Sequence, residues 1–267
     1  KNLFLKIKII KDIFKIIKKI FFVLIRIFSV KKETIYLGTE YGGWSFIDPK
    51  NTSKLNVLSA GVGEDVSFDI EFLKKYNSNI YFVDPTPRAI QHMNKLIKNL
   101  GKPNTLPFNN NSGKQPINAY NLKDVDIANI NVIEKALFNK SNLMVKFYLP
   151  KNKENVSHSI SNFQNNFAKD TEHIYVETTT VSDILQKIKI SNFDIIKLDI
   201  EGAEMAVLNH ILSKKIHPKQ ILVEFDELNS ESIFAYFKAI AIVIRLISNK
   251  YLLIHTNNFP NFLFFKG

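Results

Sequence analysis

Asn56–Asp65 (NVLSAGVGED) and Ile80–Asp84 (IYFVD) are the two stretches that decide the fold of this chain. Each opens with an apolar run of strand length. The first run ends in a G-x-G turn, and the second ends in an acid that comes 21 residues after the second glycine. Glycine has no Cβ atom, so the backbone of such a turn can approach a ligand closely. An acid at the tip of the next strand can accept hydrogen bonds from both hydroxyls of a ribose, so the two stretches predict a site for a cofactor that contains adenosine.

The residues after the turn indicate which cofactor this is. A dinucleotide site has a third glycine and places phosphates over a helix N-terminus, whereas this chain has Ser67 and its neighbours at that point. Glu64 and Asp65 would put two negative charges where a pyrophosphate would lie, which is repulsive. These acids instead suit S-adenosylmethionine, whose tail carries a sulfonium and an ammonium group. An NAD(P)-dependent oxidoreductase is the disfavoured alternative.

The composition restricts the compartment and the partners. The chain of 267 residues is 45% hydrophobic, which is ample for a large core, and it has no cysteine for disulfides or thiolate chemistry. Its net charge of +11 is concentrated in residues 1–32, which hold ten basic side chains and one acid, whereas the remainder holds 26 and 24. A nearly neutral body argues against a surface for nucleic acid. We therefore expect a cytoplasmic protein with no nucleic-acid partner.

Residues 1–32 form a segment of their own, and their pattern predicts a basic amphipathic helix. At 100° per residue the charged side chains fall within one wedge of about 120°, and the rest of the circumference is apolar. No run approaches ~18 residues without a charge, so we expect no membrane span. Two interpretations remain open. Residues 1–29 could lie in an anionic membrane surface, making the protein peripheral on the inner face of a membrane, or the helix could pack on the body or on a second subunit.

Strand and helix patterns alternate through the body, residues 33–267. We expect strands at 56–60, 79–84, 131–138, 143–149, 174–181, 193–199, 220–225, 250–255 and 261–266. We expect helices at about 64–75, 87–99, 203–213 and 230–246, one more from Ser182, and an irregular insert at 101–129. Residues 143–149 alternate as a half-buried antiparallel strand would. The alternation predicts an α/β, Rossmann-like, mostly parallel sheet with helices on both faces and ligands at the C-terminal strand edges.

Phe193–Glu204 (FDIIKLDIEGAE) is the second dense motif. Its strand delivers Asp199 and Glu201 to the sheet edge that faces the G-x-G turn. Here the chain resembles the FkbM-type S-adenosylmethionine-dependent methyltransferases, whose signature reads much like Ile-Lys-Leu-Asp-Ile-Glu-Gly-Ala-Glu. The similarity covers roughly residues 35–265, without the insert, and continues in Gly61–Asp65, Asp84–Pro87, Val156–Ser159 and Val223–Asp226.

The resemblance implies a seven-stranded methyltransferase sheet and methyl transfer to an oxygen, often a hydroxyl of a sugar or polyketide. It also implies that Gly61 and Gly63 hold the methionine part of the cofactor, Asp84 the ribose, and Ala136 the adenine. The cofactor-binding residues that we expect are Ala60, Gly61, Gly63, Glu64, Asp84, Ala136 and Asp199. Many such enzymes have an acid where this chain has Ser59. A non-catalytic, membrane-attached binding module with the same fold is therefore the second alternative.

Methyl transfer is an in-line displacement in which the protein aligns the acceptor and removes its proton. We expect Asp199 to position or deprotonate the acceptor, a small molecule or a glycan, with Glu224 or His158 assisting. The substrate-binding residues that we expect are Ser157, His158, Ser159, Glu201 and Trp44.

Each of these residues also has a plainer interpretation. Asp199 and Glu201 could cap the helix at 203–213, as Glu204 is expected to do. His158 could be a solvated loop residue, Glu224 a buried structural acid and Trp44 a core residue. Clustered Asp199, Glu201 and Glu224 could also bind Mg²⁺, but the sequence analysis assigns no metal site.

Overall fold

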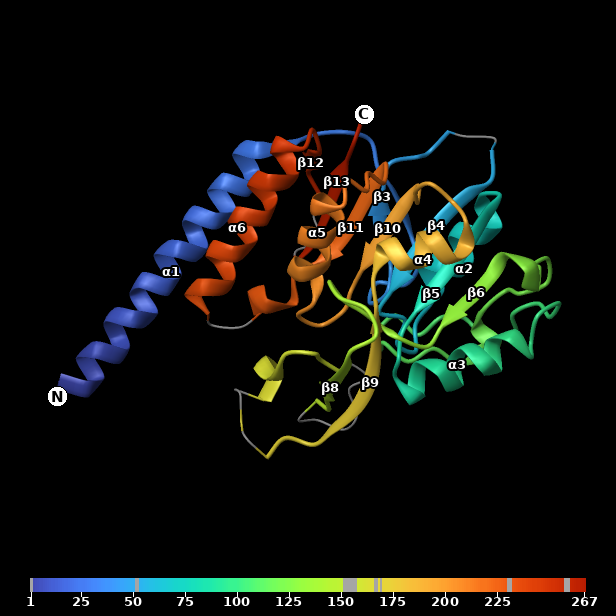
Figure 1. Cartoon of the computed structure of the whole chain (residues 1–267), viewed down its shortest axis with the longest axis horizontal. Helices are drawn as coiled ribbons and strands as arrows, with labels where there is room; N and C mark the ends of the chain where they lie inside the picture. Colours follow the sequence, from blue (N-terminus) through green and yellow to red (C-terminus); the bar gives the residue numbers. More distant parts are fainter. Residues whose placement is uncertain are drawn as a thin grey trace.

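A mixed eight-stranded sheet occupies the centre of the structure (Figure 1), in the order β1-β12-β13-β11-β10-β4-β5-β6. The computed structural model describes residues 2–50, 53–150, 158–165, 168, 170–229, 232–256 and 260–267. The strands of this sheet are β1 (Ser29–Val30), β4 (Leu55–Ala60), β5 (Ser78–Val83), β6 (Ile130–Ile133), β10 (Ile195–Leu198), β11 (Gln220–Glu224), β12 (Leu252–Ile254) and β13 (Asn261–Phe265). All neighbours in the sheet are parallel except those of β13, which runs antiparallel to β11 and β12.

Helices cover both faces of this sheet, as the alternation predicted. They are α1 (Asn2–Phe28), α2 (Ser67–Lys75), α3 (Pro87–Ile97), α4 (Val181–Ile188), α5 (Glu204–Ser213) and α6 (Ile233–Ser248). One buried core joins α1, α4, α5 and α6 to the sheet, and a second core joins α2, α3 and the hairpin of β2 (Ile35–Leu37) and β3 (Trp44–Phe46) to its other face. In β10, for example, Ile196 belongs to the first core and Ile195 to the second. Strands buried on both sides explain the nearly continuous apolar runs in the sequence.

Local signals in the sequence set the helix starts. The hydroxyl of Thr86 accepts a hydrogen bond from the amide of Ala89, and Pro87 follows as the first residue of α3, as predicted. Thr180 caps α4 in the same way by accepting from the amide of Asp183. The predicted strands and helices of the body are confirmed to within a few residues at their ends, with the exception of the third strand.

The third predicted strand, 131–138, divides into two pieces. Its first part, β6, pairs with β5, but the chain then bends where the amide of Lys135 donates to the carbonyl of Ile133 at 2.9 Å. Its second part, β7 (Ala136–Leu137), joins a separate sheet in the order β7-β9-β8, with β8 (Met144–Tyr148) and β9 (His173–Thr179). The prediction of one strand was wrong because an uninterrupted apolar run shows no sign of this tight turn. The antiparallel β8 is confirmed.

The N-terminal segment is joined to the body at two places. Helix α1 lies beside α6 (Figure 1), where Phe21 is buried and its ring meets those of Tyr236 and Phe262 edge to face at 5.2 and 6.2 Å. Residues 29–30 then pair with β12, so the sheet has eight strands rather than the expected seven. Among the described residues, no helix combines the length with the apolar run that crossing a bilayer requires.

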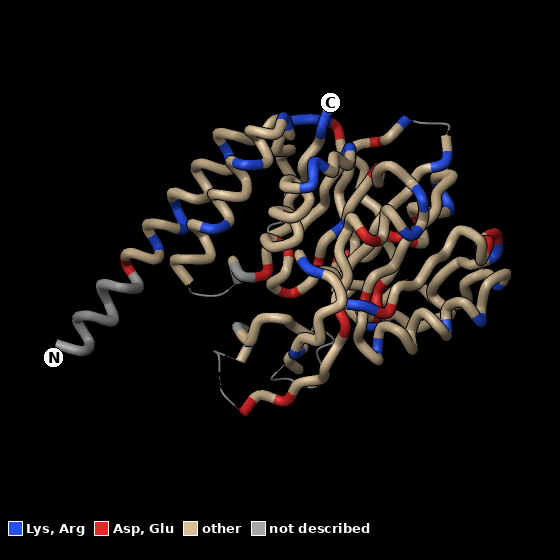
Figure 2. Tube along the Cα trace, in the orientation of Figure 1, with Lys and Arg blue, Asp and Glu red and all other residues tan. Residues whose placement is uncertain are grey.

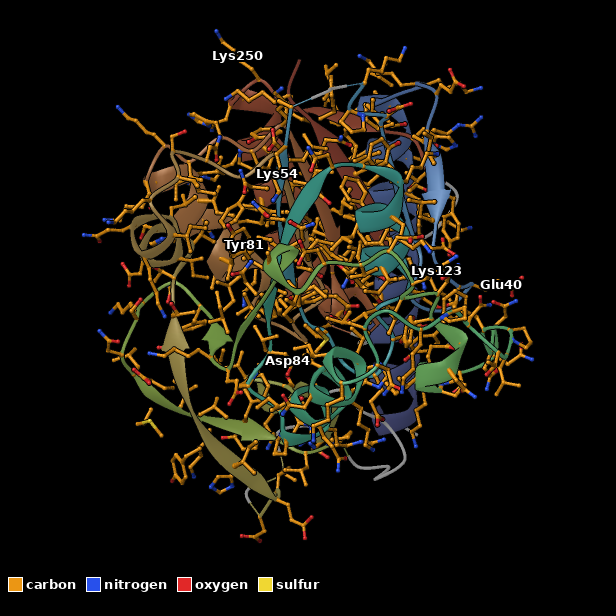
Figure 3. The ribbon with its side chains drawn as sticks, turned by 90° about the vertical axis from the view of Figure 1, so that its right-hand side faces the viewer. Glu40, Lys54, Tyr81, Asp84, Lys123 and Lys250 are labelled. Carbon is orange, nitrogen blue, oxygen red and sulfur yellow. The ribbon has the colours of Figure 1, made fainter. Side chains whose placement is uncertain are left out.

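The irregular insert, residues 101–129, contains only short turns, at Ile117–Ala119 (η1) and Ile127–Asn129 (η2). Two further short turns lie at Asn162–Asn165 (η3) and Asp226–Asn229 (η4). Figure 3 shows the molecule turned by 90°, so that the two ends of the central strands can be told apart. Lys54, before β4, marks one end, and Asp84, after β5, marks the other. The carboxyl ends of the strands, marked by Asp84, carry the candidate site.

Candidate active site

The register of the sheet brings the two sequence motifs together. Ala60 at the end of β4 pairs with Leu198 at the end of β10, and Leu198 pairs with Val223 of β11. On the other side, Ala60 pairs with Val83, the last residue of β5. The residues that follow the strands therefore meet at one edge, as predicted for the carboxyl ends of a parallel sheet.

Position 61 requires a glycine because the tip of the neighbouring strand, β10, lies close to it. Gly61 has φ +80°, and a Cβ atom built on it would lie 1.5 Å from the carbonyl oxygen of Asp199. We predicted that this glycine allows the backbone to approach a ligand. The structure shows a close approach to another strand tip, and Gly61 also lines the cavity, so the approach to a ligand stays a prediction. The absence of a side chain lets the turn after β4 pass over the tip of β10.

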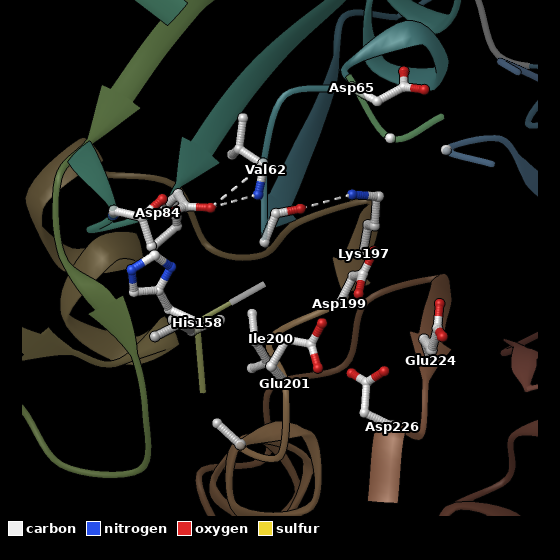
Figure 4. Close-up of a pocket in the computed structure, with 18 of the residues that line it drawn as sticks. Val62, Asp65, Asp84, His158, Lys197, Asp199, Ile200, Glu201, Glu224 and Asp226 are labelled. Atoms are coloured by element: carbon white, nitrogen blue, oxygen red, sulfur yellow. Dashed lines mark hydrogen bonds between the residues drawn. The ribbon is translucent and has the colours of Figure 1, made fainter. Parts of the chain in front are cut away.

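Asp84 is engaged with the protein by both carboxylate oxygens (Figure 4). Oδ2 accepts hydrogen bonds from the amides of Val62 at 2.9 Å and Gly63 at 3.1 Å. Oδ1 accepts from the amide and the hydroxyl of Thr86 at 2.8 and 2.7 Å. A carboxylate has about four lone-pair positions, and these four donors use them. A ribose hydroxyl at this residue would compete with these donors, so its contact with Asp84 stays a prediction.

Glu64 and Asp65, expected near a cationic cofactor tail, also have partners within the protein. Glu64 forms an ion pair with Arg88 at 2.5 Å. Asp65 accepts from the hydroxyl of Thr39, from the amide of Ser67 at the start of α2, and from the side chain of Gln115 in the insert. The insert is thereby fixed against the turn after β4.

Three carboxylates gather on the opposite side of the site. Single oxygens of Asp199, Glu224 and Asp226 all lie within 4.8 Å of one another. Burial, together with the charges of Asp199 and Glu201, raises the pKa of Glu224 to about 8. Burial also raises the pKa of Asp199, against the opposing effect of Lys197, and raises that of Asp226 well above its ordinary value. The three carboxyl groups therefore hold protons more readily than exposed acids do, and a nearby cation would favour their ionised forms.

Glu204, the first residue of α5, holds the loop that precedes the helix, and its capping of the helix stays a prediction. It is fully buried, and its carboxylate accepts from the amides of Ile200 and Gly202 at 2.9 to 3.2 Å. This loop also holds Glu201 at φ +51°. The first residues of α5 receive no capping hydrogen bond from the residue that precedes them. Asp199 and Glu201 line the cavity described below.

Lys197 and Trp44 form the floor between the two sides. Lys197 is buried in β10, and its ammonium donates to the carbonyl of Gly61 at 3.2 Å while lying 5.5 Å from the centre of the Trp44 ring. Trp44 is buried in the second core, as the plainer interpretation predicted, and it also lines the cavity. Its contact with a substrate stays a prediction.

The loop after β8 contributes one wall. The ring of His158 stacks on Phe147 and lines the cavity, on the same side as Asp84 in Figure 4. Ser159 is buried, and its hydroxyl donates to the carbonyl of Glu201 at 2.5 Å, so it supports the rim from behind. Ser157 lies outside the described residues. Whether these residues contact an acceptor stays a prediction.

Together these elements enclose a cavity of about 230 Å³. Its lining includes these predicted residues: Gly61, Gly63, Glu64, Asp84, Ala136, His158, Asp199, Glu201, Glu224 and Trp44. Ala60 lies just below it, buried in the sheet. A second groove of about 770 Å³ adjoins the first, and the two share Tyr41 and Glu224.

The comparison with protein families agrees with this geometry. The profile described as Methyltransferase FkbM domain matches residues 48–247, which include both strand tips and most of the residues that line the cavity. The chain belongs to the FkbM methyltransferase family. A search of the curated proteins found no match. The fold agrees with the assignment, since β1 is an edge addition to the seven strands expected of a methyltransferase sheet.

Three residues of this methyltransferase site were missed by the sequence analysis. Asp226 comes two residues after Glu224, a spacing that places both on one face of an extended chain, and this signal was available. Lys197 is a charge inside an otherwise apolar strand, which was a second signal. Tyr41 is 61% exposed and packs against Gly113 of the insert, where a Cβ would lie 2.3 Å from its ring; no local pattern indicates that contact.

Proposed function

We propose that this FkbM methyltransferase uses S-adenosylmethionine to methylate a hydroxyl group of a sugar, a glycan or another small molecule. The observation that carries the proposal is the meeting of the glycine turn with Asp199, Glu224 and Asp226 in one cavity that opens into a second groove. The turn follows β4 and the acids follow the neighbouring strands β10 and β11, and all three strands fall within the family match.

The chemistry of the lining fits such a cofactor. One part of the cavity is apolar, with Val62, Ala136, Leu137 and Phe147, and suits a flat adenine ring. The part lined by Asp199 and its neighbouring acids carries surplus negative charge and suits a cationic sulfur. When bound, S-adenosylmethionine supplies a methyl group on a positively charged sulfur.

The acids of the chain then act on the acceptor. In the groove beyond Tyr41, a hydroxyl can reach the cavity where Glu224 belongs to both linings. A bound cofactor would supply the methyl group to that oxygen and would keep the electron pair of its broken bond, and a carboxylate of the chain would take the hydroxyl proton. We propose that Asp199 and Glu224 accept that proton in their ionised forms, because they stand at adjacent strand ends facing the turn.

Calorimetry with S-adenosylmethionine and with NADH tests the proposal. Binding of the first ligand, followed by transfer of a labelled methyl group to a hydroxyl compound, supports it. Binding of NADH alone would favour an oxidoreductase, and binding of neither would favour a non-catalytic module. Mass spectrometry of cellular glycans and lipids, with and without the active protein, identifies the acceptor by a methyl-sized difference.

A further inference from the structure

Asp226 has a property that methyl transfer by itself does not explain. Its side chain opens η4 and is only 5% exposed, and its Oδ2 atom is fully buried without a hydrogen-bond partner. A buried carboxylate oxygen without a donor costs free energy, so its position calls for a positive partner. The carboxyl group points toward those of Asp199 and Glu201 (Figure 4).

The nearby ammonium group of Lys197 is already directed elsewhere. It donates to the carbonyl of Gly61 and lies against Trp44, at the glycine-turn side of the site. When all three are ionised, Asp199, Glu224 and Asp226 carry three negative charges against the one positive charge of Lys197. The cluster therefore has room, in charge and in hydrogen bonding, for a further cation.

We propose that Asp199, Glu224 and Asp226 bind a divalent cation of the Mg²⁺ or Mn²⁺ class. The donors are all carboxylate oxygens, which hard cations prefer, and they already lie within 4.8 Å of one another. Three protein ligands leave positions of a six-coordinate ion for water and for oxygens of an acceptor. Resting on the proposed function, the ion would orient the acceptor hydroxyl and make it more acidic.

Metal binding is measured first on the full chain without S-adenosylmethionine. Titration with Mn²⁺, followed by electron paramagnetic resonance, should show one bound ion that Mg²⁺ displaces. Asp226→Asn should weaken that binding roughly tenfold or more, and Glu224→Gln provides a second variant. The matched control is Asp124→Asn, at an exposed acid in the insert, which should bind Mn²⁺ as the unaltered chain does. Absence of Mn²⁺ binding, or unchanged binding in both site variants, overturns the proposal.

Calorimetry with S-adenosylmethionine on the same samples separates this proposal from the function. Cofactor binding without Mn²⁺ binding leaves the methyltransferase proposal standing and overturns the metal site. Mn²⁺ binding that Asp226→Asn removes, in a chain that ignores the cofactor, supports the metal site and overturns the proposed function.

An independent observation concerns the outer surface of α1. Five aliphatic side chains there form what we call the apolar stripe: Ile13, Ile16, Ile20, Val23 and Ile27. They are 44 to 68% exposed and fall within about 80° of the helix circumference. The contact with α6 uses a different face, which includes Phe14, Ile17 and Phe21. The docking interpretation of α1 thus accounts for only one of its two apolar faces.

Positive charge lies directly beside the apolar stripe. Lys15, Lys18, Lys19 and Arg26 are exposed along the same helix, and the blue segments of α1 in Figure 2 contrast with the acids near the centre of the molecule. Apolar side chains next to lysines are the pattern of a helix that lies in the interface of an anionic bilayer. We propose that the apolar stripe enters an anionic membrane surface while the flanking lysines contact lipid headgroups.

Vesicle sedimentation tests this second proposal. Vesicles with about 30% phosphatidylserine should bind the protein at low salt, and neutral phosphatidylcholine vesicles should bind it much less. The double variant Ile16→Glu, Ile20→Glu should lose binding, whereas Met144→Glu, at an exposed apolar residue of β8, should keep it. Light scattering without vesicles tests the alternative that the apolar stripe binds a second copy of the chain. A dimer that the double variant disrupts, or equal binding of both variants, overturns the proposal.

Discussion

The two sides of the methyltransferase cavity differ in where their polar atoms are directed. On the side of β4 and β5, the carboxylates of Asp84 and Asp65 accept hydrogen bonds from amides and hydroxyls of the protein itself, and that of Glu64 forms an ion pair with Arg88. On the side of β10 and β11, Asp226 keeps a buried oxygen without a partner, and the carboxylates crowd one another. The first side is a preformed scaffold. The second side lowers the stability of the folded protein, and we expect its residues to carry out the chemistry.

Gly61→Ala should have the largest effect and acts on the scaffold side. A Cβ at this position would lie 1.5 Å from the Asp199 carbonyl oxygen, so the strand tips must separate. We expect a loss of about 4 kcal/mol or more in the free energy of unfolding, measured by urea denaturation. Gly101→Ala is the control, because it has a similar φ of +83° with nothing within 4 Å. Its loss, about 1–2 kcal/mol, isolates the backbone term. Equal losses would show that the contact with Asp199 matters little.

Asp84→Ala should come second, and it corrects an expectation from the sequence. If Asp84 only held a ribose, the substitution would weaken cofactor binding with little loss of fold. Because four protein donors lose their acceptor, we expect it to lower the free energy of unfolding by about 2–4 kcal/mol as well. Asp84→Asn should lose less, since one oxygen remains. Stability is measured in urea and cofactor affinity by calorimetry; full stability with lost affinity would restore the ribose interpretation.

The scaffold side should also weaken in acid, through His92 of α3. Burial lowers the pKa of His92 to about 4, with Lys95 acting in the same direction, and its Nε2 is 3.1 Å from the hydroxyl of Tyr120. Between the folded value and the ordinary 6.5, the unfolded chain binds a proton that the folded chain refuses. Stability should therefore fall as the pH drops, by about 1 kcal/mol between pH 7 and about 5.5. His92→Gln should flatten this part of the profile, and an unchanged slope would exclude His92 as its cause.

The smallest effect on stability should come from the side of β10 and β11, and it should be an increase. Asp226→Asn removes a carboxyl group whose pKa is raised first by burial and then by its acidic neighbours, so without added metal we expect the free energy of unfolding to rise by about 0.5–1 kcal/mol. Methyl transfer should fall at the same time. Thermal unfolding and activity are measured on the same preparation. A clear loss of stability would place Asp226 with the scaffold and remove the contrast between the two sides.

The sequence was sufficient for the architecture and for the place of the site. Apolar strand runs, the cap at Thr86 and the acids after β10 are local patterns, and parallel pairing then dictates that Gly61, Asp84 and Asp199 meet. The partners of those residues were not predictable, because they depend on contacts between distant segments. Gly61 is constrained by a carbonyl 138 positions away, and Asp65 by Gln115 of an irregular insert. The bend after Ile133 was missed for a different reason, since a tight turn between two strands needs no glycine or proline.

The contact of α1 and β1 with α6 and β12 has a consequence for biosynthesis. These partners are separated by more than 200 residues, so α1 and β1 have no site to occupy until α6 and β12 have also left the ribosome. During that interval both apolar faces of α1 are exposed. A chaperone or a bilayer that shelters the nascent helix would therefore raise the yield of folded protein, and removing the helix should speed maturation of the remaining chain.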